Sequence, residues 1–307
     1  MDHDKIDRHP VARCACIDVG SNTTRLLVAM DDDGRRLREV FSERAFTRLG
    51  AARGNDGEIR ADKVAEVAAV VARQVATARR LGAQDVRIVA TAAVREAGNA
   101  AALTAAVDRE CGARLEILDG VDEARLAFAG AVGMLAERPA GLLGVVDVGG
   151  GSTELVVGTW AGGVTWSVSL PVGSSVVTEA DLPTDPPSPA ELARLRRKLA
   201  RVFADVEAPR PVRAYAVGGS ATSLRRLVGG IDLERDALAR GLQALVTRPA
   251  EEIALALGLH PERARLLPAA ILLLDAASHA LQAPLQLAGG GLREGVVLEQ
   301  LARLRAH

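Results

Sequence analysis

Residues 14–28 read CACIDVGSNTTRLLV and residues 143–157 read LGVVDVGGGSTELVV, so one pattern occurs twice in the chain. In each copy an apolar run is followed by Asp-Val-Gly, then by further Gly, Ser, Thr or Asn residues, and then by a second apolar run. This order is typical of two strands joined by a tight turn. The aspartates of the two copies, Asp18 and Asp147, lie 129 positions apart, which is about the length of a domain. The repeat therefore predicts two related domains.

The remaining segments alternate between predicted strands and helices. In the first half we expect a strand at 35–40, a helix over 59–81, a strand at 86–90, a helix over 99–110, a strand at 115–118 and a helix from about 122 to 135. In the second half we expect a strand at 164–170, a helix over 190–203, a strand at 214–217, helices over 235–245, 249–257 and 261–283, a strand at 285–287 and a closing helix. This order predicts an α/β fold in which helices cover mixed sheets.

Composition limits the classes of function. The chain has 307 residues, of which 49% are hydrophobic and only 2% are aromatic. The core must therefore consist mainly of Ala, Val, Leu and Ile. Recognition of nucleic acid by base stacking is not expected. The formal net charge is -1, so no overall field attracts a polyanion, and an anionic ligand has to be held by local groups.

The cysteines and the apolar segments indicate the cellular compartment of the protein. The three cysteines, Cys14, Cys16 and Cys111, form neither a disulfide framework nor a set of four zinc ligands. The charged segment up to Pro10 lacks the apolar stretch of a signal peptide. No run approaches the roughly 18 uninterrupted apolar residues that span a membrane. We therefore expect a cytoplasmic protein without a membrane partner.

The glycine-rich turns are the best candidates for binding a ligand. Glycine lets the backbone approach a ligand closely, and successive N–H groups together with Ser or Thr hydroxyls can point at one anion. A further Gly-Gly-Ser segment follows the strand at 214–217. The phosphate-binding candidates in these segments are Gly20, Ser21, Asn22, Thr23, Gly149, Gly150, Gly151, Ser152, Thr153, Gly219 and Ser220.

An aspartate lies on the strand just before each turn, where it would repel a bare phosphate. Asp18 and Asp147 are therefore interpreted as ligands, direct or through water, of a hard cation such as Mg²⁺, for which Mn²⁺ could substitute. Facing each other across a cleft, the two turns would hold one metal-bound phosphate chain. The alternative is that Asp-Gly turns are ordinary connections between strands. The duplication, with further glycine clusters at Gly218 and Gly289, favours binding.

Six motifs, in this order, resemble those of one enzyme family. They are IDVGSN at 17–22, TAAVREA at 91–97, GVDEARL at 120–126, VDVGGGSTEL at 146–155, VGGSAT at 217–222 and GLREG at 291–295. On these motifs the chain is identified as a member of the exopolyphosphatase and guanosine pentaphosphate phosphohydrolase (Ppx/GppA) family. That family is a branch of the superfamily of sugar kinases, acetate kinases, actin and the heat-shock chaperone ATPases. The resemblance covers essentially the whole chain.

The resemblance implies a fold of two ribonuclease H-like domains, as in actin-like ATPases. Each domain would be a mixed five-stranded sheet flanked by helices, with a cleft between them that closes around the substrate. We expect domain I at 11–128 plus 292–307 and domain II at 129–291. Larger members carry an additional C-terminal helical region, whereas this chain ends just after the GLREG motif, so the short, two-domain form is expected.

The resemblance also assigns roles to single residues. It implies that Glu123 acts on the attacking water, that Arg95 faces the cleft and holds phosphate oxygens, and that Glu154 binds metal or water. These roles suit the chemistry, because hydrolysis of a phosphoanhydride needs a positioned water and compensation of charge on the phosphoryl group. Without the family, Glu123 is an acidic residue in a first helical turn, Arg95 a solvated loop residue and Glu154 a solvent-facing strand residue.

Other arginines are candidates for the cleft. By strand alternation Arg25 points the same way as Thr23 and could add charge at the cleft mouth. Arg44, Arg48 and Arg53 precede the long helix and could form a track for a long polyanion. Scattered positions on the surface are the favoured interpretation of these three.

Several functions stay open on the sequence. The first is an exopolyphosphatase that releases orthophosphate from inorganic polyphosphate, with short chains preferred by the short form. A guanosine pentaphosphate 5′-phosphohydrolase would use the same chemistry, and the motifs do not separate the two. A small-molecule kinase and a non-catalytic phosphate or nucleotide sensor are further alternatives. The set Asp18, Glu123, Asp147 and Glu154 favours hydrolysis, so we expect an exopolyphosphatase, which could form a homodimer and has no nucleic acid partner.

Overall fold

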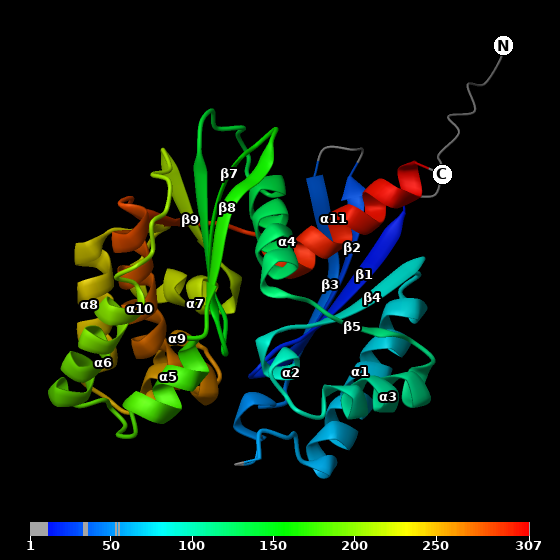
Figure 1. Cartoon of the computed structure of the whole chain (residues 1–307), viewed down its shortest axis with the longest axis horizontal. Coiled ribbons are helices and arrows are strands. Elements are labelled where there is room, and N and C mark those ends of the chain that lie inside the picture. The colour runs from blue at the N-terminus through cyan, green and yellow to red at the C-terminus, as the bar shows by residue number, and fades with distance from the viewer. Residues whose placement is uncertain (1–11, 33–35, 53, 55, 307) are drawn as a thin grey trace.

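The computed structural model describes residues 12–32, 36–52, 54 and 56–306, which fold around two mixed β-sheets (Figure 1). The first sheet has the order β3-β2-β1-β4-β5 and the second the order β10-β11-β9-β6-β7-β8. The strands of the first sheet are β1 (Arg13–Val19), β2 (Thr23–Asp32), β3 (Arg36–Phe46), β4 (Asp85–Ala90) and β5 (Leu115–Ile117). Those of the second are β6 (Leu143–Val148), β7 (Thr153–Thr159), β8 (Gly163–Leu170), β9 (Arg213–Val217), β10 (Asp232–Leu233) and β11 (Leu285–Leu287).

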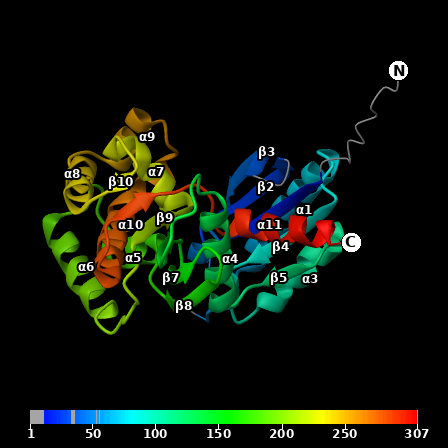
Figure 2. The same cartoon turned by 90° about the horizontal axis from the view of Figure 1, so that it is seen from above.

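Helices flank both sheets. In the first half they are a 3₁₀ turn at Gly50–Ala52, α1 (Ala61–Arg80), α2 (Ala92–Arg95), α3 (Ala100–Cys111) and α4 (Gly120–Gly133). In the second half they are α5 (Ser174–Asp181), α6 (Pro189–Val202), α7 (Gly218–Val228), α8 (Arg235–Leu245), α9 (Ala250–Leu257), α10 (Pro261–Leu281) and α11 (Leu292–Arg305). Two perpendicular views show two lobes, with α4 and α11 at their junction (Figures 1 and 2).

The two sheets share one plan. In the first, β1 pairs antiparallel with β2 and parallel with β4. In the second, β6 pairs antiparallel with β7 and parallel with β9. This equivalence confirms the two related α/β domains that the repeat predicts. The expectation of five strands in each sheet is wrong for the second, where β10 adds a sixth strand antiparallel to β11. The strand Asp232–Leu233 has only two residues, which is too short for an alternation of apolar and polar residues to be recognised in the sequence.

The helices α4 and α11 are exchanged between the sheets. Although α11 is last in the chain, its Val296 and Val297 share a buried cluster with Cys14 and Cys16 of the first sheet. In contrast, Phe128 of α4 shares a buried cluster with strands β6, β7 and β9 of the second sheet. The structure thus packs α11 against the first sheet, and the expected domain bounds stay a prediction. The expected boundary at residue 128 falls inside α4, which packs as a continuous helix against the second sheet.

Where α4 and α11 cross, glycines allow close contact of the two backbones. A methyl group on Gly130 would collide with the carbonyl oxygen of Gly291, and one on Gly295 would collide with that of Leu126. Because α4 carries Glu123 in its first turn, this contact fixes the position of Glu123 relative to the first residues of α11.

The long helix α10 forms the centre of domain II. Within the described part of the chain it is the one helix whose length and hydropathy would suffice to span a membrane. Two-thirds of its apolar window is buried, 67%, and Leu267, Leu273 and Leu274 belong to the core around the second sheet. These contacts are those of a core helix.

Candidate active site

Both glycine-rich turns have the same backbone geometry. The Gly20 N–H donates to the Thr23 carbonyl at 3.0 Å, and at the equivalent place the Gly149 N–H donates to the Ser152 carbonyl at 3.0 Å. The last residue but one of the strand before each turn is the aspartate, which is paired in register with Arg25 in domain I and with Glu154 in domain II. Residues paired in register lie on the same face of a sheet. One copy therefore places a cation beside its aspartate and the other a carboxylate.

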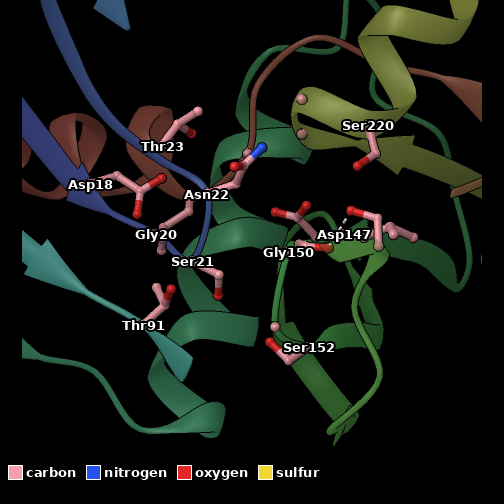
Figure 3. A pocket seen from close by; sticks show the side chains of 18 of the residues that line it. Asp18, Gly20, Ser21, Asn22, Thr23, Thr91, Asp147, Gly150, Ser152 and Ser220 are labelled. Atoms are coloured by element: carbon pink, nitrogen blue, oxygen red, sulfur yellow. Dashed lines mark hydrogen bonds between the residues drawn. The ribbon is translucent and has the colours of Figure 1, made fainter. Parts of the chain in front are cut away.

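The two turns meet face to face between the domains. A Cβ atom on Gly150 would lie 2.9 Å from the Ser21 Cβ, and one on Gly151 would lie 2.7 Å from the Ser21 Oγ. Figure 3 shows Gly20, Ser21 and Asn22 of the first turn opposite Gly150 and Ser152 of the second. Glycine permits an approach this close, which explains Gly150 and Gly151 of the second turn.

A cavity lies between these turns and collects most of the predicted site residues. The predicted residues that line it are Asp18, Gly20, Ser21, Asn22, Thr23, Glu123, Asp147, Gly149, Gly150, Gly151, Ser152, Glu154, Gly219 and Ser220. Thr153 and Arg95 are not among the described residues that line it. Thr153 is fully buried and its hydroxyl donates to the Val172 carbonyl at 2.6 Å, so this side chain anchors the strand behind the turn.

Glu123 is held at the cavity by Arg95. The Asp119 side chain caps α4 by accepting from the Asp122 N–H, and Glu123 follows in the first turn. Arg95 Nη1 donates to Glu123 Oε2 at 2.9 Å and to the Leu118 carbonyl at 2.8 Å. The structure therefore places Arg95 behind Glu123. Burial raises the pKa of the Glu123 carboxyl to about 7, although the hydrogen bond from Arg95 acts in the opposite direction.

Three more carboxylates approach the same cavity. Burial, and next the nearby Asp18, raise the pKa of Asp147 to about 6. Burial and then Glu123 raise the pKa of Glu154 well above its ordinary value, and Glu154 Oε1 accepts from the Ser169 hydroxyl at 2.8 Å. Burial also raises the pKa of Asp18. Buried like charges are costly, so this arrangement favours a bound cation or protons.

The fit of these carboxylates to Mg²⁺ can be judged from their surroundings. Within the described residues, no three His, Cys, Asp or Glu side chains form a group that could hold a metal ion alone. The predicted set Asp18, Asp147 and Glu154 therefore stays a prediction. Mg²⁺ commonly takes only one or two carboxylates and completes its shell with water and substrate phosphate. Asp18 Oδ1 is buried without a hydrogen-bond partner, so Asp18 and Asp147 suit that pattern.

Arginines supply positive charge at the cavity. Arg25, Arg263 and Arg293 line the cavity, and Arg44 is the register partner of Arg25. Burial, and next the guanidinium of Arg293, lower the pKa of Arg25 to about 9. Burial and then Arg44 lower the pKa of Arg263 to about 10. Burial and, after it, repulsion between the arginines both disfavour their charged forms, and a bound polyanion would offset these costs.

Several of these residues were missed on the sequence. Arg263 lies in the first turn of α10, and Arg293 lies in the GLREG motif, to which no site was assigned. The helix α5 was also missed, and its Ser174 and Ser175 line the cavity. Strand alternation did find Arg25. The arginine-rich composition gives no signal for the others, because they meet only after the chain has folded.

The raised carboxylate pKa values predict that the metal-free protein becomes less stable as the pH rises. Between the ordinary pKa of 4.5 and about 7, the folded state keeps a proton on Glu123 that the unfolded state has released. The free energy of unfolding therefore falls across this window, by about 3 kcal/mol for Glu123 at ~1.4 kcal/mol per pKa unit. Thermal melting in EDTA between pH 5 and 8 measures this.

Glu123→Gln provides the control for that measurement, because the amide does not titrate. Its melting temperature should fall less between pH 5 and 8 than that of the natural protein. Added Mg²⁺ should raise the melting temperature of the natural protein more at pH 8 than at pH 5. A natural protein that melts at a steadily higher temperature from pH 5 to 8, in parallel with Glu123→Gln, would contradict the assignment.

Comparison with known proteins agrees with this geometry. The sequence profile of the Ppx/GppA phosphatase family matches residues 27–304. Exopolyphosphatase 1 of Mycobacterium leprae is 33% identical over 305 residues, covering 94% of this chain and 89% of the relative. Exopolyphosphatase 1 of Mycobacterium tuberculosis is 32% identical over 305 residues, covering 94% and 88%.

A solved structure gives the same result for the fold. The crystal structure of the Aquifex aeolicus member of the Ppx/GppA family superposes with a TM-score of 0.82 at 28% identity. The superposition covers 96% of this chain and 99% of that chain. It confirms the expected fold of two actin-like domains with a cleft between them. By profile, by sequence and by fold, the chain belongs to the Ppx/GppA phosphatase family.

Proposed function

We propose that this protein is an exopolyphosphatase, which hydrolyses the terminal phosphoanhydride bond of inorganic polyphosphate and releases orthophosphate. The observation that carries the proposal is the cavity between the two turns, where Glu123 and Asp147 face the arginines Arg25, Arg263 and Arg293. A carboxylate with a pKa of about 7 suits a water-directing group at neutral pH. The arginines suit the repeated negative charges of a phosphate chain. The names of the mycobacterial relatives support the same reaction.

The proposed reaction uses groups from both domains. The two glycine-rich turns and the arginines hold the terminal phosphoryl group and the next phosphates. Glu123, oriented by Arg95, accepts a proton from a water molecule as that water attacks the terminal phosphorus. The bond from this phosphorus to the bridging oxygen breaks, and orthophosphate and a chain shorter by one phosphate are formed. Mg²⁺, which we propose binds at Asp18 and Asp147, would offset charge on the phosphoryl oxygens.

The lining of the cavity favours polyphosphate over a guanosine nucleotide. It is formed by Gly, Ser, Thr, Asn, Ala, Val and Leu beside charged residues, and no aromatic side chain of the described chain is among them. A purine base would thus find no ring for stacking. A polyphosphate chain needs only charge and hydrogen-bond donors. We further propose that the enzyme acts in the cytoplasm, and the homodimer considered on the sequence stays a prediction.

Orthophosphate release from a panel of substrates tests this proposal. The purified protein would be supplied, in Mg²⁺, with short-chain polyphosphate, long-chain polyphosphate or guanosine pentaphosphate. We expect the highest kcat/KM with short-chain polyphosphate. A higher kcat/KM with guanosine pentaphosphate would replace the proposal by the nucleotide hydrolase. Binding of these compounds without release from any of them would leave a sensor.

A further inference from the structure

A further contact joins the two domains, besides the crossing of α4 and α11 and the meeting of the two glycine-rich turns. It is made by residues 46–50, which begin at the last residue of β3 in domain I, and by the start of α10 in domain II. The rings of Phe46 and His260 stack with centroids 4.0 Å apart and planes inclined by 22°. Arg48 Nη2 lies 2.8 Å from Glu262 Oε1 in an ion pair. No covalent connection between the domains passes here, so these side chains bridge the lobes by contact alone.

On its domain I side, this segment is bonded to the first glycine-rich turn. The Arg48 N–H donates to the Asn22 carbonyl at 3.0 Å, and the Gly50 N–H donates to the Ser21 carbonyl at 2.8 Å. Behind them the Thr47 and Thr24 hydroxyls are hydrogen-bonded at 3.1 Å within the buried core. The segment 46–50 therefore moves with the turn that lines the cavity.

The backbone of Arg48 is held in an unfavourable conformation. Its φ is 47°, in the left-handed region that costs most residues other than glycine on the order of 1 kcal/mol or more. An arginine persists there although glycine would relieve the strain. This conformation lets the N–H bond Asn22 of domain I while the guanidinium pairs with Glu262 of domain II.

On its domain II side, the contact is also next to the cavity. Glu262 directly precedes Arg263, which lines the cavity and is only 7% exposed. His260 caps α10, because its Nδ1 accepts from the Glu262 N–H at 3.3 Å. Burial, and next the charge of Glu262, raise the pKa of Glu179 on α5. Glu262 therefore lies near a like charge within domain II, and Arg48 supplies the opposite charge from domain I.

We propose that residues 46–50 and the start of α10 form an interdomain clasp, in which the Arg48–Glu262 ion pair and the Phe46–His260 stack hold the cleft in its closed, substrate-binding arrangement. The clasp can open, because its ion pair is exposed, with 53% of the Arg48 side chain and 38% of the Glu262 side chain accessible to solvent. Exposed pairs are weak. The expected effect of the clasp on KM rests on the proposed function, whereas its expected effect on the closure of the cleft does not.

Charge reversal on each side tests the clasp. Arg48→Glu and Glu262→Arg each replace the attraction by repulsion, and the double variant restores the pair with its charges exchanged. We expect each single variant to raise the KM for short-chain polyphosphate by about two- to fivefold. The apparent affinity for substrate is proportional to the fraction of molecules whose cleft is closed, and each variant lowers that fraction. The double variant should return to within about twofold of the natural protein. Small-angle scattering without substrate should show a larger radius of gyration in each single variant and recovery in the double variant.

Two comparisons separate a clasp from a simple change of charge near a polyanion site. Arg48→Glu adds negative charge and Glu262→Arg adds positive charge, so a pure charge effect would move KM in opposite directions, whereas loss of the clasp raises it in both. Arg60→Glu, at an exposed arginine paired with Asp62 within domain I, makes the same charge change as Arg48→Glu without crossing the cleft. It should leave the radius of gyration unchanged.

A variant at the stacked rings tests the other half of the clasp. His260→Asn keeps an N-cap acceptor for α10 but removes the ring, and we expect a larger radius of gyration and a raised KM. The clasp is overturned if both single charge variants keep the radius of gyration of the natural protein, or if KM moves in opposite directions in the two. A protein that releases no phosphate from polyphosphate would contradict the proposed function. In that case the scattering data would still decide on the clasp.

Discussion

Glu123→Gln is expected to lower kcat for orthophosphate release from short-chain polyphosphate by about 10²- to 10⁴-fold, the usual contribution of general acid–base catalysis. The amide keeps the shape of the side chain and can remain beside Arg95, but it cannot accept the proton of the attacking water. Because polyphosphate is held by other groups, KM should change far less than kcat. Steady-state release of orthophosphate in saturating Mg²⁺ measures both.

The neighbouring acidic residue provides a matched control. Asp122 lies in the same first turn of α4, and half of its side chain is exposed, 50%. Asp122→Asn changes the charge of the turn by the same amount and should keep kcat within about twofold, as expected for a surface substitution. If Glu123→Gln retained more than a tenth of kcat, the water-directing role would have to pass to another group, with Glu154 as the next candidate.

Removal of the divalent cation should have an effect of similar size. In excess EDTA we expect orthophosphate release to fall to the background rate, because the five carboxylates of the described residues that line the cavity, Asp18, Glu123, Asp147, Glu154 and Glu294, would otherwise repel the substrate. Asp147→Asn should raise the Mg²⁺ concentration for half-maximal activity by at least about tenfold. Loss of a group that only orients a metal ligand lowers metal affinity by about tenfold or more, and loss of the ligand itself should lower it at least as much. Titration of activity with MgCl₂ measures the shift.

Asp108→Asn is the control for the metal prediction. Asp108 lies on the exposed side of α3 and does not line the cavity, so its substitution should leave the Mg²⁺ titration unchanged. Full activity in EDTA, or identical titrations for Asp147→Asn and the natural protein, would contradict a metal role for Asp147.

The part of the site that the sequence predicted is the part built from local pattern. Asp18 and Asp147 could be found because an apolar strand, an aspartate and a glycine-rich turn follow one another within a few residues, and the pattern occurs twice. The structure places both turns at one cavity. Local pattern also predicted the mixed α/β class of each half, because a strand pair followed by alternating helices and strands is typical of a mixed sheet covered by helices.

What the sequence could not predict depends on contacts between distant segments. Arg263 and Arg293 meet Arg25 at the cavity although more than 200 residues separate them from it, and an arginine-rich chain gives no reason to choose these two. The helix α5 reads SSVVTEAD, in which serine and β-branched residues are weak helix formers. Burial of Val177 and Thr178 against domain II compensates for this weakness. The resemblance implied that Arg95 holds phosphate oxygens, but the structure pairs it with Glu123 and does not place it among the described residues that line the cavity.

The isotopic composition of the released orthophosphate tests the proposed reaction most directly. Short-chain polyphosphate would be treated with the enzyme and Mg²⁺ in ¹⁸O-labelled water, and the orthophosphate analysed by mass spectrometry before any exchange. Attack of water on the terminal phosphorus at this cavity predicts one ¹⁸O atom in each orthophosphate released. Absence of orthophosphate, or orthophosphate without the label, would contradict hydrolysis at the chain end by a water molecule that Glu123 directs.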